Sequence, residues 1–416
     1  MSGAGVKRAI RELVMSRSQL DPLPQAGQAS GCVAIIPARG GSRGVPRKNL
    51  QAVGGRSLLE RSVECALAAD AVDSVWVSTD DAEIATLARR CGAEVIMRPE
   101  ALASATASSE SALQHALEAL AERAVHPRLL VMLQCTAPFT TAADVDGAIA
   151  KLETEDADSC FTAVADHQFL WRQDNGHAVG INHDGRTRVR RQEMPPQFRE
   201  NGGVYVVRTE AFVREQTRFC GRTVLCVTDA ERSIEIDSPA DLIQADALAQ
   251  HLDRGTALEQ LPPNPAAVIF DFDGVFTDGG VFVDEHGAES VRCDRSDGLG
   301  LSALRQHQIP VLVLSKERNP VVSVRTQKLG LEALHGIDDK LSTLQRWMQT
   351  RGIDWERAVF VGNDVNDVAC MRAVGCAVCP ADAYPEARRV AQIRLQKRGG
   401  RGAVREICDL LAQRLS

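Results

Sequence analysis

Short apolar runs alternate with amphipathic stretches along the chain from Val33 onward. The runs are rich in β-branched residues, as buried strands are, and the stretches between them repeat apolar residues at helical spacing. The expected strands of the N-terminal half are 32–38, 74–80, 94–98, 129–135, 159–166, 201–207 and 223–227. The expected helices are 57–69, 81–92, 108–124 and 241–252. This alternation predicts βαβ units on a mostly parallel sheet.

A second series of the same kind begins at Ala267, with expected strands at 266–273, 311–317 and 358–364. The halves show no internal repeat, so we expect two different α/β domains. Between them the periodicity is lost and prolines gather, which is typical of a domain boundary. We therefore predict an α/β protein with two doubly wound, Rossmann-like domains. The expected divisions are a flexible tail (1–30), a first domain (31–252), a linker (253–265) and a second domain (266–416).

Composition and charge remove several classes of protein. The formal net charge is −7, which argues against a general nucleic-acid binder with its basic surface. No run approaches the roughly 20 apolar residues of a membrane span, and the N-terminus lacks the apolar core of a secretory signal. The close pair Cys376 and Cys379 has no second pair or nearby His to complete a zinc site. We expect reduced thiols in a cytoplasmic protein without nucleic-acid or membrane partners.

The loop after the first strand, residues 37–49, joins glycines and a serine to cations at Arg39, Arg43, Arg47 and Lys48. Small residues let the backbone approach a ligand, and clustered cations supply counter-charge for a triphosphate. The loop also follows a parallel strand, where open α/β sheets bind ligands. Neither G-x-x-x-x-G-K-[ST] nor G-x-G-x-x-G is present. A solvated basic turn is the alternative, but the clustering favours a polyphosphate site.

A second feature is the segment 233–237, in which Glu235 and Asp237 alternate with isoleucines. Alternate side chains of a strand point to the same face, so the two carboxylates would point together. Beside a polyphosphate, such a pair can hold Mg²⁺, which bridges phosphate oxygens. Taken alone the pattern is weak, because alternating acids in a strand usually form a solvated face.

Several motifs follow one another in a fixed order between residues 32 and 250. They are IPARGGSRGVPRKNL, WVSTD, SATASS, LQCTAP, RRQEMP, NGGVYV and SIEID. This ordered set resembles the CMP-sialic acid synthetases (acylneuraminate cytidylyltransferases), and it is far more specific than the first motif alone. The resemblance implies a nucleotidyltransferase-type first domain. It also implies Mg²⁺-dependent transfer of CMP from CTP to a sialic-type sugar acid, with release of pyrophosphate.

The same resemblance implies roles for individual residues. The residues that would bind CTP are Arg39, Ser42, Arg43, Lys48 and Asn49, with Arg39 and Lys48 stabilising the leaving pyrophosphate. Those that would frame cytidine and the sugar are Asp80, Ser104, Thr106 and Ser108. Those that would face the acidic sugar are Gln134, Arg191, Gln192 and Tyr205. The family usually has Asp-x-Asp as its metal pair, whereas the first acid here is Glu235, so we assign metal binding to Asp237 before Glu235.

The second half carries its own ordered set of polar residues at strand ends. Asp271 and Asp273 follow an apolar strand, Ser315 follows the next, Lys340 opens a helix, and the segment 362–367 follows a third strand. Two carboxylates so close together repel unless a cation lies between them. Each residue alone would read as a cap or turn residue. Together they indicate a cation-dependent site.

This set resembles the haloacid dehalogenase superfamily phosphatases over residues 266–415. With DFDGVFTDGG, DGLG, SKER, GIDDK, PADA and KRGGRGAVREI, it looks most like 3-deoxy-octulosonate and nonulosonate phosphate phosphatases. The resemblance implies that Asp271 is the nucleophile and Asp273 the general acid and base. Ser315 and Lys340 would hold the phosphoryl group. The Mg²⁺ ligands would come from Asp271, Asp273, Asn363, Asp364 and Asp367.

One departure concerns the metal site, because the family commonly has Asp where this chain has Asn363. An amide oxygen can bind Mg²⁺ but brings no charge. Asp364 or Asp367 would then substitute, and the strength of the phosphatase becomes an open question.

The segments between Asp271, Ser315 and Lys340 are too short for a separate cap domain. A capless site would be open to water unless a neighbouring subunit covers it. We therefore predict a homo-tetramer through the second half, as related capless phosphatases form, with dimer contacts through the first half. The hairpin-like segment VFVDEHGAESVRC is the expected contact.

The leading hypothesis is a bifunctional enzyme. Its second half would dephosphorylate a 9-phosphorylated sugar acid, and its first half would transfer CMP from CTP to the product. One alternative is a cytidylyltransferase whose second half is a weakly active or inactive oligomerisation scaffold. Another is a synthetase for 3-deoxy-octulosonate, which is less favoured because RGGSRGVPRKN is closer to the acylneuraminate form. An acylamino group, a hydroxyl or a legionaminate-like group at C5 of the sugar all remain open.

Overall fold

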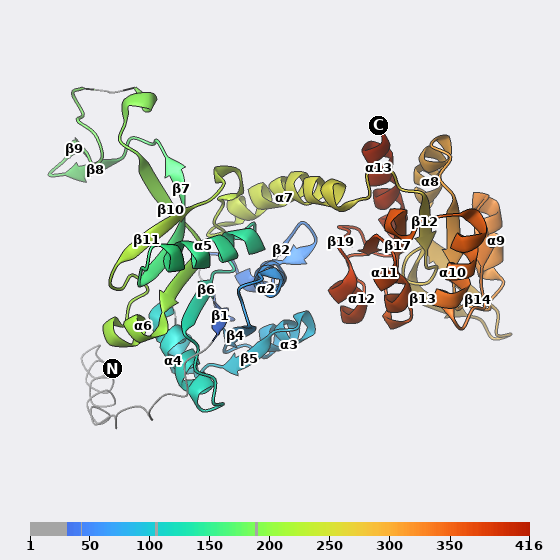
Figure 1. Ribbon diagram of the computed structural model, residues 1–416, viewed down its shortest axis with the longest axis horizontal. Coiled ribbons are helices and arrows are strands. Elements are labelled where there is room, and N and C mark those ends of the chain that lie inside the picture. The colour runs from blue at the N-terminus through green and yellow to red at the C-terminus, as the bar shows by residue number, and fades with distance from the viewer. Residues whose placement is uncertain (1–30, 43, 105–106, 188–189) are drawn as a thin grey trace.

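The computed structural model of the chain describes residues 31–42, 44–104, 107–187 and 190–416 (Figure 1). Each half is built on its own sheet, and the long helix α7 (Pro239–Gln260) joins the two halves. Strands alternate with helices in both halves. The predicted α/β class with two doubly wound domains is therefore confirmed.

The first sheet has seven strands in the order β11-β7-β10-β6-β1-β4-β5. It is mixed, because β10 runs antiparallel to both of its neighbours while the other pairs are parallel. Its strands are β1 (Cys32–Pro37), β4 (Ser74–Thr79), β5 (Glu94–Met97), β6 (Leu129–Leu133), β7 (Ser159–Asp166), β10 (Gln197–Arg208) and β11 (Thr223–Val227). Two hairpins stand apart from it, β2 (Ala52–Val53) with β3 (Arg56–Ser57) and β8 (Trp171–Asp174) with β9 (His177–Gly180). The helices are α2 (Leu58–Ala68), α3 (Ala82–Cys91), α4 (Ser109–Ala121), α5 (Ala142–Thr154) and α6 (Thr209–Glu215).

The second sheet has six strands in the order β16-β15-β12-β17-β18-β19, all parallel. Its strands are β12 (Ala267–Phe270), β15 (Val311–Leu314), β16 (Glu332–Leu334), β17 (Ala358–Val361), β18 (Cys376–Cys379) and β19 (Ile393–Arg394). A separate hairpin joins β13 (Thr277–Val283) to β14 (Glu289–Cys293). The helices are α8 (Asp297–Gln306), α9 (Val321–Leu329), α10 (Lys340–Arg351), α11 (Val368–Ala373), α12 (Pro385–Val390) and α13 (Ala403–Leu415).

Apolar side chains cover both faces of each sheet. On β1, Val33 and Ile35 belong to one core cluster, and Ala34 and Ile36 belong to another. Helices therefore have to pack on both sides of the strand, which is why the strand sequences read as continuous apolar runs. The ends of these runs meet at the carboxyl edge of each sheet, where polar loops begin.

Two segments differ from the sequence-based expectation. The predicted strand 233–237 is wrong, since this segment lies outside the sheet. Its Ile236 main-chain N–H donates to the main-chain oxygen of Thr136 at 2.8 Å, and its carbonyl accepts from Lys48. Because both main-chain groups of Ile236 are bonded to other segments, they do not pair with a neighbouring strand of the sheet. The expected linker 253–265 is helical over most of its length, because α7 continues to Gln260 and buries Ala257 in the second core.

The twelve cysteines are free, and each is buried or half-buried. Burial raises the pKa of the thiols of Cys135 and Cys379 to about 12, so they are protonated at neutral pH. Within the described ranges, no helix combines the length and the apolar character needed to cross a membrane.

Candidate active sites

The basic loop after β1 borders a cavity of about 360 Å³ beyond the carboxyl ends of β1, β5 and β6. Asn49 anchors the loop by donating from Nδ2 to the main-chain oxygen of Arg39 at 2.9 Å. Arg39 in turn reaches across to the main-chain oxygen of Ser104, also at 2.9 Å. Of the residues predicted from the sequence, those that line the cavity are Arg39, Ser42, Lys48, Asn49, Ser104, Ser108, Gln134 and Asp237. The predicted residues Arg43 and Thr106 lie outside the described residues.

Two further residues support the cavity from β4 and β5. Asp80, which was predicted, accepts a hydrogen bond at Oδ1 from the main-chain N–H of Gly40 at 3.0 Å. Arg98, which was not predicted, lines the cavity and donates to the main-chain oxygen of Ser78 at 2.8 Å. Burial lowers the pKa of Arg98, and its Nε has no partner among the described residues. Its position directly after β5 is a signal that could have pointed to it, although a weaker one than the cluster of cations in the basic loop.

Lys48 connects the basic loop to the acidic pair. Its Nζ donates to the main-chain oxygen of Ile236 at 2.7 Å and lies 3.1 Å from Oδ1 of Asp237. Glu235 is half-buried, and its burial together with Asp237 raises the pKa of its carboxyl. A cation between the two carboxylates would relieve this repulsion. The pair therefore fits a divalent metal, although the segment that carries it is not a strand.

A tight turn places the acidic pair beside two residues expected to face the sugar. Gly202 has φ +63°, and a Cβ added there would overlap Oε1 of Glu235 and lie 3.2 Å from Oε1 of Gln134. The turn thus requires glycine both for its backbone conformation and for space. Tyr205 is buried, its hydroxyl donates to Glu200, and burial raises its pKa further above the ordinary range.

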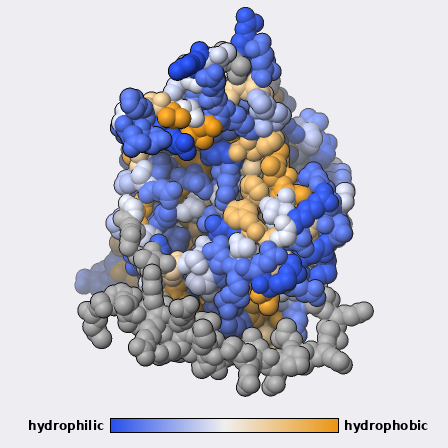
Figure 2. Space-filling view, turned by 90° about the vertical axis from the view of Figure 1, so that its left-hand side faces the viewer, coloured by the Kyte–Doolittle hydropathy of each residue, from blue (hydrophilic) through white to orange (hydrophobic). Residues whose placement is uncertain are grey.

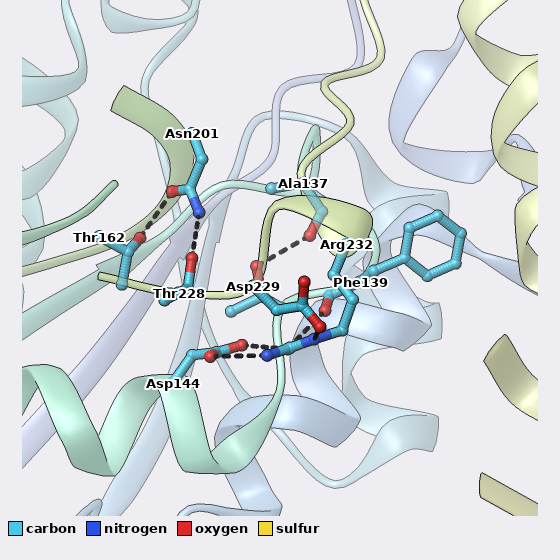
Figure 3. Close-up of a pocket in the computed structure, with 9 residues that line it drawn as sticks. Ala137, Phe139, Asp144, Thr162, Asn201, Thr228, Asp229 and Arg232 are labelled. Carbon is cyan, nitrogen blue, oxygen red and sulfur yellow. Dashed lines mark hydrogen bonds and ion pairs between the residues drawn. The ribbon is translucent and has the colours of Figure 1, made fainter. Parts of the chain in front are cut away.

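Behind this turn lies a second, much smaller pocket (Figure 3). Its volume of about 10 Å³ leaves room for a single water and not for a substrate. Asn201 is held there on both sides, accepting from Thr162 Oγ1 at 2.7 Å and donating to Thr228 Oγ1 at 2.9 Å. The pocket therefore anchors the Gly202 turn rather than binding a substrate.

The same close-up shows how the acidic segment is attached to α5. Arg232 forms two hydrogen bonds with the carboxylate of Asp144, at 2.5 and 3.2 Å. Arg232 ends the short helix η4 (Ala230–Arg232), shortly before Glu235 in the chain. This ion pair fixes where the acidic pair emerges beside the cavity.

Gln192 and Tyr205, both predicted to face the sugar, are not among the described residues that line the cavity. Gln192 is exposed on the short helix η3 (Arg191–Glu193). The side chain of Arg191 lies outside what the structure describes.

The second site lies at the carboxyl ends of β12, β15 and β17. Asp271 directly follows β12, and Lys340 is the first residue of α10. Lys340 Nζ lies 2.7 Å from Oδ1 of Asp271 and 2.7 Å from Oδ1 of Asp367, and all three residues are buried. Ser315 follows β15, is also buried, and accepts at Oγ from the main-chain N–H of Glu317 at 3.0 Å. The structure therefore unites residues that are far apart in sequence.

Electrostatics at this site favour a charged lysine and oppose ionisation of Asp271. Burial and the neighbouring Asp367 raise the pKa of Asp271, and Lys340 works in the opposite direction. Although burial alone would lower it, Asp271 and Asp367 together raise the pKa of Lys340. The cluster holds two acids against one fixed positive charge, so a metal cation would complete its neutralisation.

Asp273 lies on the turn that follows β12. Its Oδ1 accepts from Thr277 Oγ1 at 3.4 Å, and the same hydroxyl accepts from the main-chain N–H of Gly274 at 3.1 Å. Burial, and next the charge of Glu317, raise the pKa of Asp273. A carboxyl with a raised pKa is suited to donating a proton to a leaving alcohol.

The loop after β17 offers an amide oxygen rather than a carboxylate to a metal. Asn363 Oδ1 is buried and has no hydrogen-bond partner among the described residues, as a vacant metal ligand would be. Asp367 is already used by Lys340 and by the main-chain N–H groups of Asn363 and Asp364, and Asp364 caps η6 (Val365–Asp367). In the described ranges no three His, Cys, Asp or Glu side chains form a ligand set by themselves. A metal here would also need amide and carbonyl oxygens.

Comparison with known proteins links both halves to characterised families. The sequence profile of the family described as "Cytidylyltransferase" matches residues 33–252. N-acylneuraminate cytidylyltransferase A of Danio rerio is 28% identical over 397 residues, which cover 93% of this chain and 90% of that protein.

The second half has relatives of its own. The 3-deoxy-D-manno-octulosonate 8-phosphate phosphatase of Yersinia pestis is 33% identical over 153 residues, 36% of this chain and 82% of that protein. A crystal structure of the phosphatase of the same name from Moraxella catarrhalis, with magnesium ion, phosphate ion and KDO bound, is 27% identical. It covers 39% of this chain and 92% of that one, with a TM-score of 0.36.

Proposed function

Because the chain belongs to the cytidylyltransferase family and its C-terminal half is a phosphatase-type domain of the haloacid dehalogenase superfamily, we propose a bifunctional enzyme of sugar-acid activation. The first half would convert CTP and a sialic-type sugar acid to the CMP-sugar and pyrophosphate. The second half would first remove phosphate from the 9-phosphorylated form of that acid. We propose residues 31–252 and 266–416 as the two functional units, with α7 connecting them. The observation that carries the proposal is that Arg39, Lys48 and Asp237 line one cavity, and that Asp271, Lys340 and Asp367 contact one another at the edge of the second sheet.

In the cytidyl transfer, the anomeric hydroxyl of the sugar attacks the α-phosphorus of CTP, and pyrophosphate leaves. Arg39 and Lys48, with Ser42 and Asn49 in the same loop, bind the phosphates and neutralise the charge that develops on the leaving group. Gln134 faces the sugar from the opposite wall, beside the Gly202 turn. Asp237 and Glu235 would hold Mg²⁺, which would supply positive charge to the triphosphate.

In the phosphatase reaction, a carboxylate oxygen of Asp271 attacks phosphorus, and the sugar hydroxyl leaves with a proton from Asp273. Asp273 then takes a proton from water, the water attacks the aspartyl phosphate, and inorganic phosphate is released with Asp271 restored. Lys340 and Ser315 hold the phosphoryl oxygens. Mg²⁺, when bound by Asp271, the Asp273 carbonyl and Asn363, adds charge neutralisation at the transferred group.

One observation favours the alternative of a weakly active scaffold in the second half. Asn363 brings no negative charge, Asp367 is held at both oxygens by Lys340 and by main-chain N–H groups of the loop, and Oδ1 of Asp364 accepts from the main-chain N–H of Val365. Phosphate release from a 9-phosphorylated sugar acid, compared between the native chain and Asp271→Asn, separates the two functions. Release that depends on Asp271 supports the enzyme, and its absence leaves the scaffold.

The identity of the sugar is tested separately. Pyrophosphate release from CTP is measured with acids that carry an acylamino group, a hydroxyl or a legionaminate-like substituent at C5, and with 3-deoxy-octulosonate. We expect the nonulosonic acids to be used and 3-deoxy-octulosonate to be a poor substrate. Preference for the latter would overturn the sialic-type assignment.

Assembly into a homo-tetramer through the second half and a dimer through the first is part of the proposal. Val281, Phe282 and Val283 on β13 are each more than half exposed, at 52%, 71% and 63%. In the first half, apolar residues on β9, β10 and β11 are exposed, namely Val179, Phe198 and Val227. Figure 2 shows the side of the first half on which β8, β9 and β10 lie, and an apolar stripe runs there between hydrophilic margins. Light scattering of the full chain and of its Phe282→Ser variant tests the proposed assembly. A monomeric native chain would contradict the proposed assembly.

A further inference from the structure

The two halves meet at a charged seam made of Glu60 and Glu64 on α2 and of Arg388 and Arg394 on α12 and β19. Glu60 Oε1 lies 3.0 Å from Arg388 Nη1 and 3.2 Å from Arg394 Nη2. Glu64 Oε1 lies 2.9 Å from Arg394 Nη1. The side chains of Glu60 and Arg394 are only 10% and 8% exposed, so the seam is largely screened from water. Such a pair holds a defined geometry, because breaking it would leave a charge buried.

A main-chain contact accompanies the ion pairs. The tip of the β2–β3 hairpin, at Gly55, packs so closely on the second half that an added Cβ would lie 3.1 Å from the main-chain oxygen of Gln396. Gln396 begins the segment 396–402, which we call the glycine loop. In the sequence, this hairpin comes shortly after Lys48 and Asn49 of the basic loop. The first half therefore touches the glycine loop through the same element that leaves its own cavity.

The glycine loop lies directly on the turn that carries the phosphatase carboxylates. Gly400 donates from its main-chain N–H to the oxygen of Val275 at 3.0 Å. A Cβ added at Gly399 would overlap the main-chain oxygen of Gly274. Backbone is thus packed against backbone, with no flexible side chain to absorb a shift. Gly274 and Asp273 share the hydroxyl of Thr277, so the glycine loop packs on the same turn that holds Asp273.

The seam arginines Arg388 and Arg394 are also linked, through hydrogen bonds, to the loop after β17 that carries Asn363. Arg394 Nη2 and Arg388 Nη2 both donate to the main-chain oxygen of Ala381, at 3.0 and 3.2 Å. The main-chain N–H of Ala381 binds the oxygen of Lys397 in the glycine loop at 3.0 Å. Shortly after Ala381, the main-chain N–H of Tyr384 donates to the main-chain oxygen of Asn363 at 2.8 Å. The same guanidinium groups therefore hold Glu60 on one side and two supports of the phosphatase site on the other.

We propose that the cytidylyltransferase half braces the phosphatase site, with Glu60 and Glu64 acting as positioning residues for Asp273 through Arg394, Arg388 and the glycine loop. This inference rests on the proposed phosphatase activity. A seam that only attaches the halves would affect stability, and it would leave the chemistry of Asp273 unchanged.

The test uses the full chain with Glu60→Gln and Glu64→Gln combined. Glutamine at position 60 can still accept the capping hydrogen bond from Ser57, so α2 keeps its N-terminus, while the charge and the acceptor that face the two arginines are lost. The matched control is Glu153→Gln, which removes an exposed ion pair with Arg128 within the first half. Pyrophosphate release from CTP reports that the first half remains folded.

We expect the double variant to lose about tenfold in phosphatase kcat, because small misplacements of reacting groups are costly. We expect KM to change little and the pH dependence assigned to Asp273 to shift, with native values in the control. Hydrogen exchange should become faster in residues 271–278 and 396–402. Native kcat and a native pH profile in the double variant would overturn the proposal, whether or not the halves separate more easily.

The exchange measurement also keeps this inference distinct from the proposed function. If the native chain shows no Asp271-dependent phosphate release, the phosphatase assignment fails. Exchange in the two segments then decides alone whether the seam orders the turn. Unchanged exchange there would reject the brace independently of any activity.

Discussion

Lys340 and Asp367 form an ion pair without access to water, with Nζ and Oδ1 2.7 Å apart and exposed fractions of 2% and 0% for the two side chains. The same Nζ lies equally close to Asp271. One lysine thus holds the expected nucleophile to the loop after β17, and the pair has a structural as well as a catalytic consequence.

We expect Lys340→Met to abolish phosphate release and to lower the free energy of unfolding by about 3–5 kcal/mol, since two buried carboxylates lose their counter-charge. Urea denaturation measures the loss. The matched control is Lys328→Met, on an exposed position of α9, for which we expect less than about 0.5 kcal/mol. Equal stability of the two variants would contradict the role given to the pair.

We expect Asn363→Asp to tighten Mg²⁺ binding roughly tenfold or more, because the number of charged ligands governs the affinity of such sites. Titration calorimetry of the full chain with Mg²⁺, made with Asp237→Asn in the background, isolates the second site. Asn175→Asp in the exposed turn of the β8–β9 hairpin is the matched control. If both variants bind like the native chain, Asn363 is not a ligand.

We expect Gly202→Ala to reduce kcat/KM for CMP transfer by at least roughly a hundredfold, since the new Cβ would overlap Glu235 and strain a residue with φ +63°. The matched control is Gly176→Ala, which also has positive φ, at +81°, but has open space around it. Steady-state kinetics with CTP and the preferred acid provide the measurement. A similar loss in both variants would show that backbone strain, and not the acidic pair, is responsible.

We expect the seam between the halves to weaken in acid. Burial would raise the pKa of Glu60, but Arg394 and the main-chain N–H of Ser57 outweigh it and hold that pKa below the ordinary value of 4.5. A carboxyl with a lowered folded pKa adds stability above its unfolded pKa, and this stability is lost as the pH falls through the folded one. Thermal unfolding between pH 7 and roughly pH 3 should show a steeper acid loss for the native chain than for Glu60→Gln. If the stability of the native chain and of Glu60→Gln falls equally with pH, the Glu60 carboxylate does not stabilise the seam.

Several parts of this picture could be read from local sequence. The strands were predictable because both sheet faces are covered, which makes runs such as 32–38 apolar without interruption. The residues of the basic loop and Asp271 were predictable because they directly follow such apolar runs. Arg98 also follows a strand directly and was missed, since a single arginine is a weaker signal than a cluster of cations. The segment 233–237 was misread, because alternation is shared by strands and by extended segments that bind elsewhere.

The amino-acid sequence by itself determined the α/β class, the two series of elements and the identity of most charged residues at the two sites. These depend on periodicity and on neighbours along the chain. The tertiary structure decided which polar groups meet: Asp367 binds Lys340, Glu60 binds Arg394, and Asn363 Oδ1 has no partner within the part of the chain that the structure describes. Such pairs join residues far apart in sequence. Their distances depend on how sheets and helices pack, which no local pattern records.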